Sequence, residues 1–141
     1  MIMNNSLTII ISGNPLGKIR SRKGSQGAWY NPQEDIMRIN ERKVKEQLPD
    51  GFSIIKKNIP VIVNLIAFFL PLKKEITKEF LEKIQNEDVY YTHKPDRDNI
   101  DKFVLDILSG IVFCDDDHVC DGSIQKYYTP DNPRIEVEIL W

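Results

Sequence analysis

Lys94-Pro95-Asp96-Arg97-Asp98-Asn99-Ile100-Asp101-Lys102 begins the most informative part of this 141-residue chain, and Cys114-Asp115-Asp116-Asp117-His118 ends it. From Lys94 to Asp121 eight aspartates stand against three cations, so the local charge is −5. Folding brings these like charges together, which is unfavourable unless a cation joins them. Hard oxygen ligands of this kind suit Mg²⁺ or Mn²⁺. The segment therefore predicts a site for a divalent metal ion.

An amphipathic helix is predicted between the two acidic stretches. Asp98 or Asn99 is expected to cap its N-terminus, and Ser109-Gly110 is expected to end it. A short extended piece, residues 111–113, then leads to the three consecutive aspartates. The opposite, polar stripe of the helix carries Asp98, Lys102 and Asp106. The buried face follows the i, i+3, i+4, i+7 spacing of apolar residues: Ile100, Phe103, Val104, Ile107, Leu108 and Ile111.

The rest of the chain carries strand and helix patterns. β-branched and apolar runs predict strands over residues 6–12 and 60–70. Helical spacing predicts helices over residues 33–48 and 77–86. The inward-facing candidates of the first of these helices are Ile36, Ile39 and Val44.

The C-terminal residues are expected to form a hairpin, with residues 118–128 joined to residues 133–141. Together these elements predict an α+β fold. We expect a single domain spanning residues 1–141, with a mixed sheet of four or five strands and helices packed on it.

Composition favours a soluble globular protein, since 41% of the residues are hydrophobic and 28% are charged. Two cysteines, Cys114 and Cys120, provide no disulfide framework and are expected to be reduced thiols. The longest apolar run, residues 61–72, is too short and too interrupted for a membrane helix. No signal peptide is recognisable at the N-terminus. A cytoplasmic protein without membrane contact is the expectation.

All charged residues among the first 33 are basic. No acidic residue precedes Glu34, and this segment has a charge of +4 although the whole chain has −2. A basic front and an acidic core are typical of an enzyme that grips phosphates and cuts near a metal. The alternative is a solvated loop without a partner. The candidate phosphate contacts are Lys18, Arg20, Arg22 and Lys23.

Two aromatic residues, Trp29 and Tyr30, follow the basic residues. One interpretation is that they stack on a base or sugar of a nucleic acid. The other is that they are hydrophobic anchors at the start of the next helix.

Asp96 and Asp98 are two residues apart, so in an extended segment both side chains point the same way and reach one ion. The alternative for this pair is helix capping combined with a turn. Lys102 lies one turn after Asp98 and one turn before Asp106. It either forms ion pairs with these carboxylates or presents a cation to a phosphate.

The stretch from Lys94 to Val119 resembles the RusA-like Holliday junction resolvases. The family pattern is Asp-x-Asp-Asn, a Lys four residues after the second Asp, an apolar helix, and an Asp-Asp pair about 15 residues further on. Gly13-Asn14-Pro15, followed by Lys18 and Arg20, is similar to the N-terminal signature of the family. The residues that match the main pattern here are Asp96-Arg97-Asp98-Asn99, Lys102 and Asp115-Asp116.

Three aspartates stand where the pattern needs two. The best register makes Asp116 the acidic residue of the family, and a slip to Asp117 stays open.

The resemblance implies that Asp96, Asp98 and Asp116 bind Mg²⁺, with Mn²⁺ as a possible substitute, for metal-assisted hydrolysis of a DNA phosphodiester. Lys102 would then face the scissile phosphate. Asp106 is expected to orient Lys102, and Asp115 to lie beside the metal ligand.

The implied partner is branched DNA, in particular a four-way junction, bound by a homodimer that makes paired symmetric nicks during recombination and repair. A phage or prophage origin is common in this family. Three alternatives stay open: a metal-dependent nuclease of other branched DNA or of RNA, a non-catalytic DNA-binding module, and a metal-buffering or structural protein.

Overall fold

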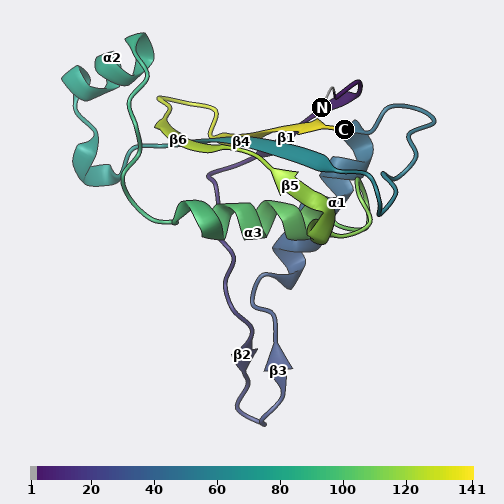
Figure 1. Ribbon diagram of the computed structural model, residues 1–141. Coiled ribbons are helices and arrows are strands. Elements are labelled where there is room, and N and C mark those ends of the chain that lie inside the picture. The colour runs from purple at the N-terminus through teal and green to yellow at the C-terminus, as the bar shows by residue number, and fades with distance from the viewer. Residues whose placement is uncertain (1–2) are drawn as a thin grey trace.

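The computed structural model describes residues 3–141, and in it five strands form one mixed sheet with two of the three helices on one face (Figure 1). The five strands are β1 (Ser6–Ser12), β4 (Val61–Phe69), β5 (Val119–Asp121), β6 (Ile124–Tyr128) and β7 (Arg134–Leu140). The helices are α1 (Glu34–Gln47), α2 (Lys78–Asn86) and α3 (Arg97–Leu108), with single turns of 3-10 helix at η1 (Lys73–Glu75) and η2 (Asp116–His118). A separate small hairpin consists of β2 (Arg22–Lys23) and β3 (Trp29–Tyr30). The predicted α+β fold with a mixed sheet is confirmed.

Strand β4, predicted from its long apolar run, is the centre of the sheet. It pairs antiparallel with β7 on one side and parallel with β5 and β6 on the other. The predicted C-terminal hairpin is therefore wrong, because β4 lies between β6 and β7. Alternating apolar residues identify strands but not their neighbours, and a strand as apolar as β4 is stabilised by partners on both edges. The β4 residues that face the helices are Val61, Val63, Leu65, Ala67 and Phe69, all buried.

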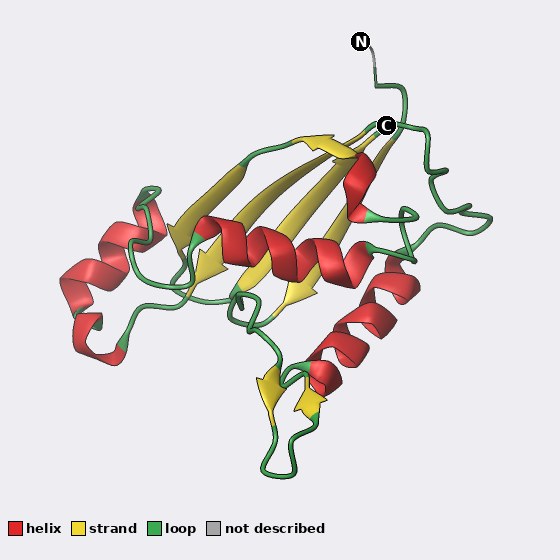
Figure 2. Ribbon diagram, turned by 60° about the horizontal axis from the view of Figure 1, so that its bottom comes forward, coloured by secondary structure: helices red, strands yellow, loops and turns green. Residues whose placement is uncertain are grey.

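Helix α3 packs its predicted apolar face against the sheet, and α1 lies on the same side, in contact with β1 and α3 (Figure 2). The predicted buried face is confirmed except for Ile111, which is partly exposed. Two details differ from the prediction. The cap of α3 is Asp96 rather than Asp98 or Asn99, because the helix begins at Arg97. In α1, Ile36 and Ile39 are exposed, whereas the inward residues are Met37, Asn40 and Val44.

The helix and its inward residue Val44 were therefore predicted correctly, whereas Ile36 and Ile39 were wrong. The observed inward set has the spacings of three and four that one helix face requires. No helix within residues 3–141 has the length and apolar character to cross a bilayer.

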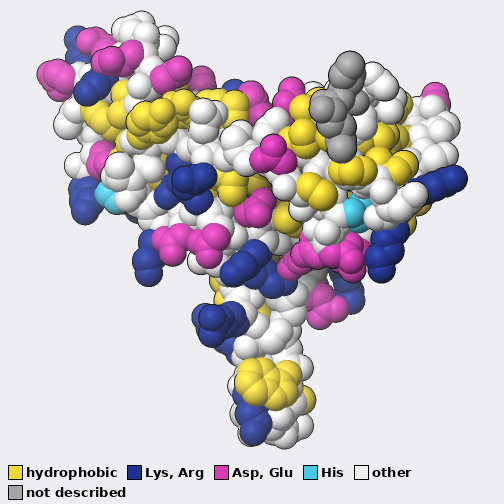
Figure 3. Space-filling view, viewed as in Figure 1, with side chains coloured by type: hydrophobic (Ala, Val, Ile, Leu, Met, Phe, Trp, Pro, Cys, Tyr) yellow, Lys and Arg dark blue, Asp and Glu magenta, His cyan; other side chains and the backbone are white. Residues whose placement is uncertain are grey.

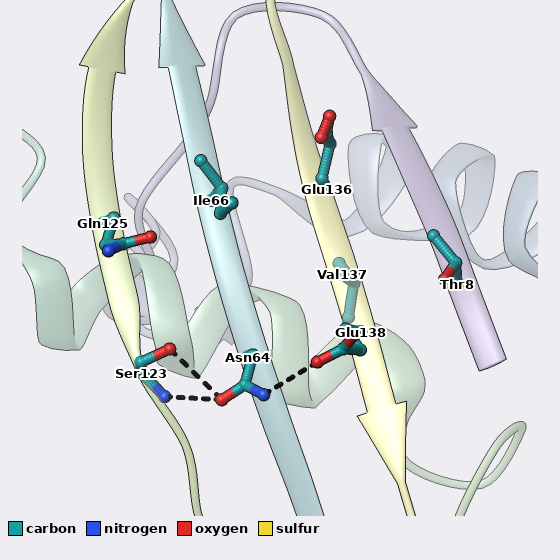
Figure 4. A pocket seen from close by; sticks show the side chains of 8 residues that line it. All are labelled: Thr8, Asn64, Ile66, Ser123, Gln125, Glu136, Val137 and Glu138. Carbon is teal, nitrogen blue, oxygen red and sulfur yellow. Dashed lines mark hydrogen bonds between the residues drawn. The ribbon is translucent and has the colours of Figure 1, made fainter. Parts of the chain in front are cut away.

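Among residues 3–141 no helix covers the opposite face of the sheet, and a hollow on it is lined by Ser123 and by side chains from β1, β4, β6 and β7 (Figure 4). The polar groups here bind one another. The Asn64 amide nitrogen donates to Glu138 Oε1 at 3.0 Å, and the Asn64 Oδ1 accepts from the Ser123 backbone N–H at 3.0 Å. This face lies on the side of the sheet away from α3 and its aspartates.

Part of the basic N-terminal segment forms the hairpin β2–β3. The hairpin projects from the helix-covered side and extends farthest from the sheet (Figures 1 and 2). Its aromatic residues Trp29 and Tyr30 are 70% and 49% exposed. The interpretation of these two residues as hydrophobic anchors is therefore wrong.

We expect Gly122→Ala to lower the free energy of unfolding by about 3 kcal/mol, as overpacking against rigid atoms does. Gly122 separates β5 from β6, and a Cβ atom there would overlap the carbonyl oxygen of Val63 in β4. Gly51→Ala is the control: Gly51 also has a positive φ, of 75°, but has open space around it. It should cost only the backbone strain, about 1 kcal/mol. Urea unfolding measures both, and equal losses would contradict the close approach at Gly122.

Candidate active site

The first acidic stretch lies at the N-terminus of α3. Asp96 is the N-cap residue, but its side chain makes no capping hydrogen bond, and Asp98 lies exposed in the first helical turn. The premise that both side chains point the same way from an extended segment is wrong, because the helix already begins at Arg97. Lys102 lies one turn further on the same stripe as Asp98, with 3.7 Å between its Nζ and Asp98 Oδ2.

The second acidic stretch forms η2, which a buried histidine holds in place. Asp115 Oδ1 accepts the backbone N–H of Asp116 at 2.7 Å and so caps the turn. His118 is 7% exposed, with Nδ1 2.8 Å from the Ile59 carbonyl oxygen and Nε2 3.4 Å from the Asp115 backbone nitrogen. An Nδ1–H tautomer satisfies both contacts, since Nδ1 then donates and Nε2 accepts. Nothing in the sequence indicates that His118 holds this turn, because its partner Ile59 lies 59 residues earlier in the chain.

The charges of the two acidic stretches act on each other. Burial, followed by the negative charges of Asp116 and Asp98, raises the pKa of the Asp101 carboxyl. Burial also raises the pKa of Asp116, and its contact with Asp115 and the charges of Asp106 and Asp117 add to the effect. Helix α3 and turn η2 therefore bring carboxylates 98, 101, 106 and 116 into one electrostatic neighbourhood, which we call the acidic cluster.

Asp101 was not among the predicted site residues. Its position three residues after Asp98 could have indicated it, because residues three apart lie on one side of a helix.

The effect of Asp96 is seen at a different group. Its charge acts on Lys126, whose pKa burial lowers and Asp96 partly restores. Within residues 3–141, no three carboxylate, histidine or cysteine side chains are grouped closely enough to hold one metal ion as they stand. The electrostatics nevertheless fit a cation. The cluster consists of hard oxygen donors, and a positive charge among them would relieve the repulsion that adds to burial in raising the pKa values of Asp101 and Asp116.

Asp106 differs from its expected role. Its carboxylate binds Lys18, with 2.6 Å between Lys18 Nζ and Asp106 Oδ2, rather than orienting Lys102. The side chains are only 30% and 38% exposed, so this pair is shielded more than a typical surface ion pair. It joins the basic N-terminal segment to the acidic cluster.

The base of the projecting hairpin is fixed on α3 by further contacts. The Lys18 backbone N–H donates to the Asn99 carbonyl oxygen at 2.9 Å. Gly17 lies so close to the motif that a Cβ atom there would come within 2.7 Å of Pro95 Cβ and 3.1 Å of Asn99 Cβ. On the other side, the buried Gln33 amide donates to the Gly17 carbonyl at 2.8 Å and accepts from the Ile19 N–H at 3.0 Å. These contacts position the basic residues beside the aspartates.

Figure 3 shows the result on the surface. Acidic side chains gather at the level of α3 and η2, and basic side chains lie next to them at the base of the hairpin. Of the four predicted DNA contacts, Arg20, Arg22 and Lys23 are exposed, whereas Lys18 is half-buried in its contact with Asp106.

Comparison with known proteins agrees with this arrangement. The sequence model of a family described as endodeoxyribonuclease RusA matches residues 12–140. The match includes both acidic stretches and the basic segment. The chain is also similar to the uncharacterized protein YqaN of Bacillus subtilis (strain 168), with 34% identity over 76 residues. That similarity covers 52% of this chain and 53% of YqaN, so the chain spans about half the length of the curated relative that it matches.

We expect Asp116→Asn to raise the free energy of unfolding at pH 7 by a few tenths of a kcal/mol, because exposed charges are screened by water. The pKa of Asp116 is raised in the folded protein, so its ionised form destabilises the fold above that pKa. The difference between variant and parent should vanish near pH 3, where the carboxyl is protonated in both states.

Urea unfolding at the two pH values measures this effect, and Asp131→Asn, in the turn before β7, is the control outside the cluster. A variant less stable than the parent at pH 7 would contradict the repulsion.

Proposed function

Because this chain belongs to the endodeoxyribonuclease RusA family, we propose that it is a divalent-metal-dependent endodeoxyribonuclease that resolves four-way (Holliday) DNA junctions by paired symmetric nicks. The observation that carries the proposal is the shared electrostatic neighbourhood of Asp98 and Asp116, which come from different elements and face a fixed basic segment. Carboxylates alone would repel DNA, whereas carboxylates beside basic residues that bind the DNA backbone suit metal-assisted cleavage of a phosphodiester.

The proposed metal ligands are Asp96, Asp98 and Asp116. Support for Asp98 and Asp116 is their position in the acidic cluster, and support for Asp96 is that its carboxylate is not used for capping. Asp101, which belongs to the same cluster, is available as a further ligand. A bound Mg²⁺ or Mn²⁺ would activate a water molecule and offset charge on the scissile phosphate. Asp115 caps the turn that presents Asp116, so its contribution is to hold that carboxylate in place.

Lys102 is proposed to contact the scissile phosphate. It lies on the same stripe as Asp98, its side chain is 63% exposed, and the 3.7 Å contact with Asp98 is a loose one. A cation held beside the ligands in this way stabilises negative charge that grows in the transition state. Its structural contribution is small, because exposed ion pairs one turn apart contribute only about 0.3–0.5 kcal/mol.

The basic segment is proposed to hold the DNA backbone. Arg20, Arg22 and Lys23 are exposed and lie on the projecting hairpin or at its base, where they can neutralise phosphates without reading sequence. Lys18 acts mainly as an anchor, since its ammonium already neutralises Asp106.

A homodimer is proposed because the substrate requires it. A four-way junction has near two-fold symmetry, and two symmetric nicks need two active sites related by the same symmetry. One acidic cluster in each of two subunits provides them.

We expect Asp98→Asn and Asp116→Asn to abolish Mg²⁺-dependent cleavage of a synthetic four-way junction while binding the junction at least as tightly as the parent. The exchange is nearly isosteric, removes a charge that repels phosphate, and replaces an anionic ligand with a neutral one. Asp96→Asn should behave in the same way. Cleavage and gel-shift assays on four-way junctions, flaps, forks and RNA duplexes measure activity and substrate choice together.

Matched variants in the aspartate turn test the assignment of Asp116. Asp115→Asn should keep more activity, because Asn also caps a turn. Asp117→Asn should keep more activity too, since the Asp117 carboxylate already lies beside a cation, with 3.9 Å between Lys57 Nζ and Asp117 Oδ2. An inactive Asp117→Asn beside an active Asp116→Asn would move the ligand by one residue. If Asp96→Asn, Asp98→Asn and Asp116→Asn all still cleave junctions, the proposed mechanism is overturned.

We expect Arg20→Ala and Arg22→Ala each to weaken junction binding and to reduce the slope of log K against log salt by about 0.9 for each lost phosphate contact. Lys18→Ala should change the slope less, because Lys18 is paired with Asp106. Fluorescence anisotropy at several salt concentrations gives the slopes. An unchanged slope in the Arg20→Ala, Arg22→Ala double variant would exclude the segment as a phosphate contact.

A further inference from the structure

The hairpin β2–β3 carries two large aromatic side chains in water, far from the core. Trp29 and Tyr30 are 70% and 49% exposed although they are among the most hydrophobic residues of this segment. They do not anchor α1, whose N-terminus is instead held by Gln33. These two rings therefore do not belong to the hydrophobic core of the described residues. They lie on the element that projects farthest from the body (Figure 3).

The pairing of the two strands determines which side chains share a face. Lys23 lies opposite Trp29, and Arg22 lies opposite Tyr30. Directly opposite residues in an antiparallel pair point to the same side of the hairpin. Each side of the hairpin thus presents one aromatic ring next to one cation. Rings for bases and cations for the adjacent phosphates are the combination that binds unpaired nucleic acid.

We propose that this hairpin is a wedge that stacks Trp29 on an unstacked base at the branch point of the DNA, and thereby favours branched over linear substrate. The inference deepens the proposed function and rests on it. A linear duplex offers no exposed base faces along its length, whereas a branch point does. A flat ring stacks on any base, so this selection depends on structure and not on sequence.

The wedge has a fixed relation to the acidic cluster. Its base is bonded to the motif through the Lys18 backbone N–H and the Asn99 carbonyl, and through the Lys18–Asp106 ion pair. Close packing of Gly17 on Pro95 leaves no room for the base to shift toward α3. A ring stacked at the branch point would therefore set the position of the nearby phosphates relative to the aspartates.

A second copy of this chain is the other conceivable occupant of the hairpin, and the charges favour DNA. Three exposed cations, at positions 20, 22 and 23, accompany the rings, and the segment contains no acidic residue that could bind a cation of a partner subunit. Dimer formation through the hairpin is one outcome of the test below.

The first experiment uses the fluorescence of Trp29 in a Trp141→Phe background, which leaves Trp29 as the only tryptophan. Trp141 packs edge-on against Phe52, a contact that Phe preserves. The protein is titrated in EDTA with a four-way junction or with a linear duplex of the same base composition. We expect the junction to quench the Trp29 emission strongly and the duplex to quench it little. Equal quenching by both, or none, would overturn the proposal.

The second experiment compares affinities. Trp29→Ala should weaken junction binding by about 5- to 150-fold, the range that one stacked base contributes. Binding to linear duplex should stay within about twofold, and the salt slope should match that of the parent, because no phosphate contact is lost. Trp29→Phe should restore part of the loss. Tyr90→Ala, which removes a ring that is 67% exposed on another part of the molecule, is the matched control and should change nothing.

The outcomes separate this inference from the proposed function. Should the parent cut four-way junctions in Mg²⁺ while Trp29→Ala keeps the full preference for junctions, the wedge is wrong and the resolvase proposal stands. If Trp29→Ala converts a dimer into monomers in analytical ultracentrifugation, the hairpin binds a second copy and the wedge is again wrong. A parent that neither binds nor cuts branched DNA overturns both proposals.

Discussion

The packing of Gly17 and Lys18 on α3 is the constraint on which the functional arrangement depends. It brings the N-terminal segment, whose charged residues are all basic, against the Asp96–Asn99 motif, which lies about 80 residues further along the chain. Gly17 is required because a Cβ atom would collide with the side chains of Pro95 and Asn99. Lys18 then neutralises Asp106, one of the charges that act on Asp116. A single contact region thus fixes the cationic hairpin and moderates the repulsion within the acidic cluster.

That cluster has a cost in the folded protein, visible in the raised pKa values of Asp101 and Asp116. A fold selected for stability alone would separate these carboxylates or pair each with a cation. Here Lys18 is tightly paired with Asp106, while Lys57 and Lys102 lie 3.9 and 3.7 Å from Asp117 and Asp98. The remaining negative charge is what a divalent cation would offset. The buried His118 and the cap by Asp115 hold η2 in its place against this repulsion.

The sequence predicted those features that depend on local periodicity. The apolar run of β4 and the spacing of Ile100, Phe103 and Val104 in α3 are local patterns, and both elements are confirmed. Features that depend on partners distant in sequence were missed or wrong. The insertion of β4 between β6 and β7, the pairing of Asp106 with Lys18, and the contact of His118 with Ile59 join residues that no local pattern relates. Asp98 illustrates the boundary case, because a helix that begins at Arg97 takes Asp98 out of the extended segment on which the prediction relied.

The central claim is that Asp98 and Asp116 hold one divalent metal ion beside the fixed basic segment. Crystals of the protein with a non-hydrolysable four-way junction and Mn²⁺ would test it by anomalous scattering. The account predicts a peak at a Mn²⁺–oxygen distance of about 2.2 Å from carboxylates of both residues, with a DNA phosphate on the side of Lys102. A peak without carboxylate oxygens of Asp98 and Asp116, or no peak at saturating Mn²⁺, would contradict it.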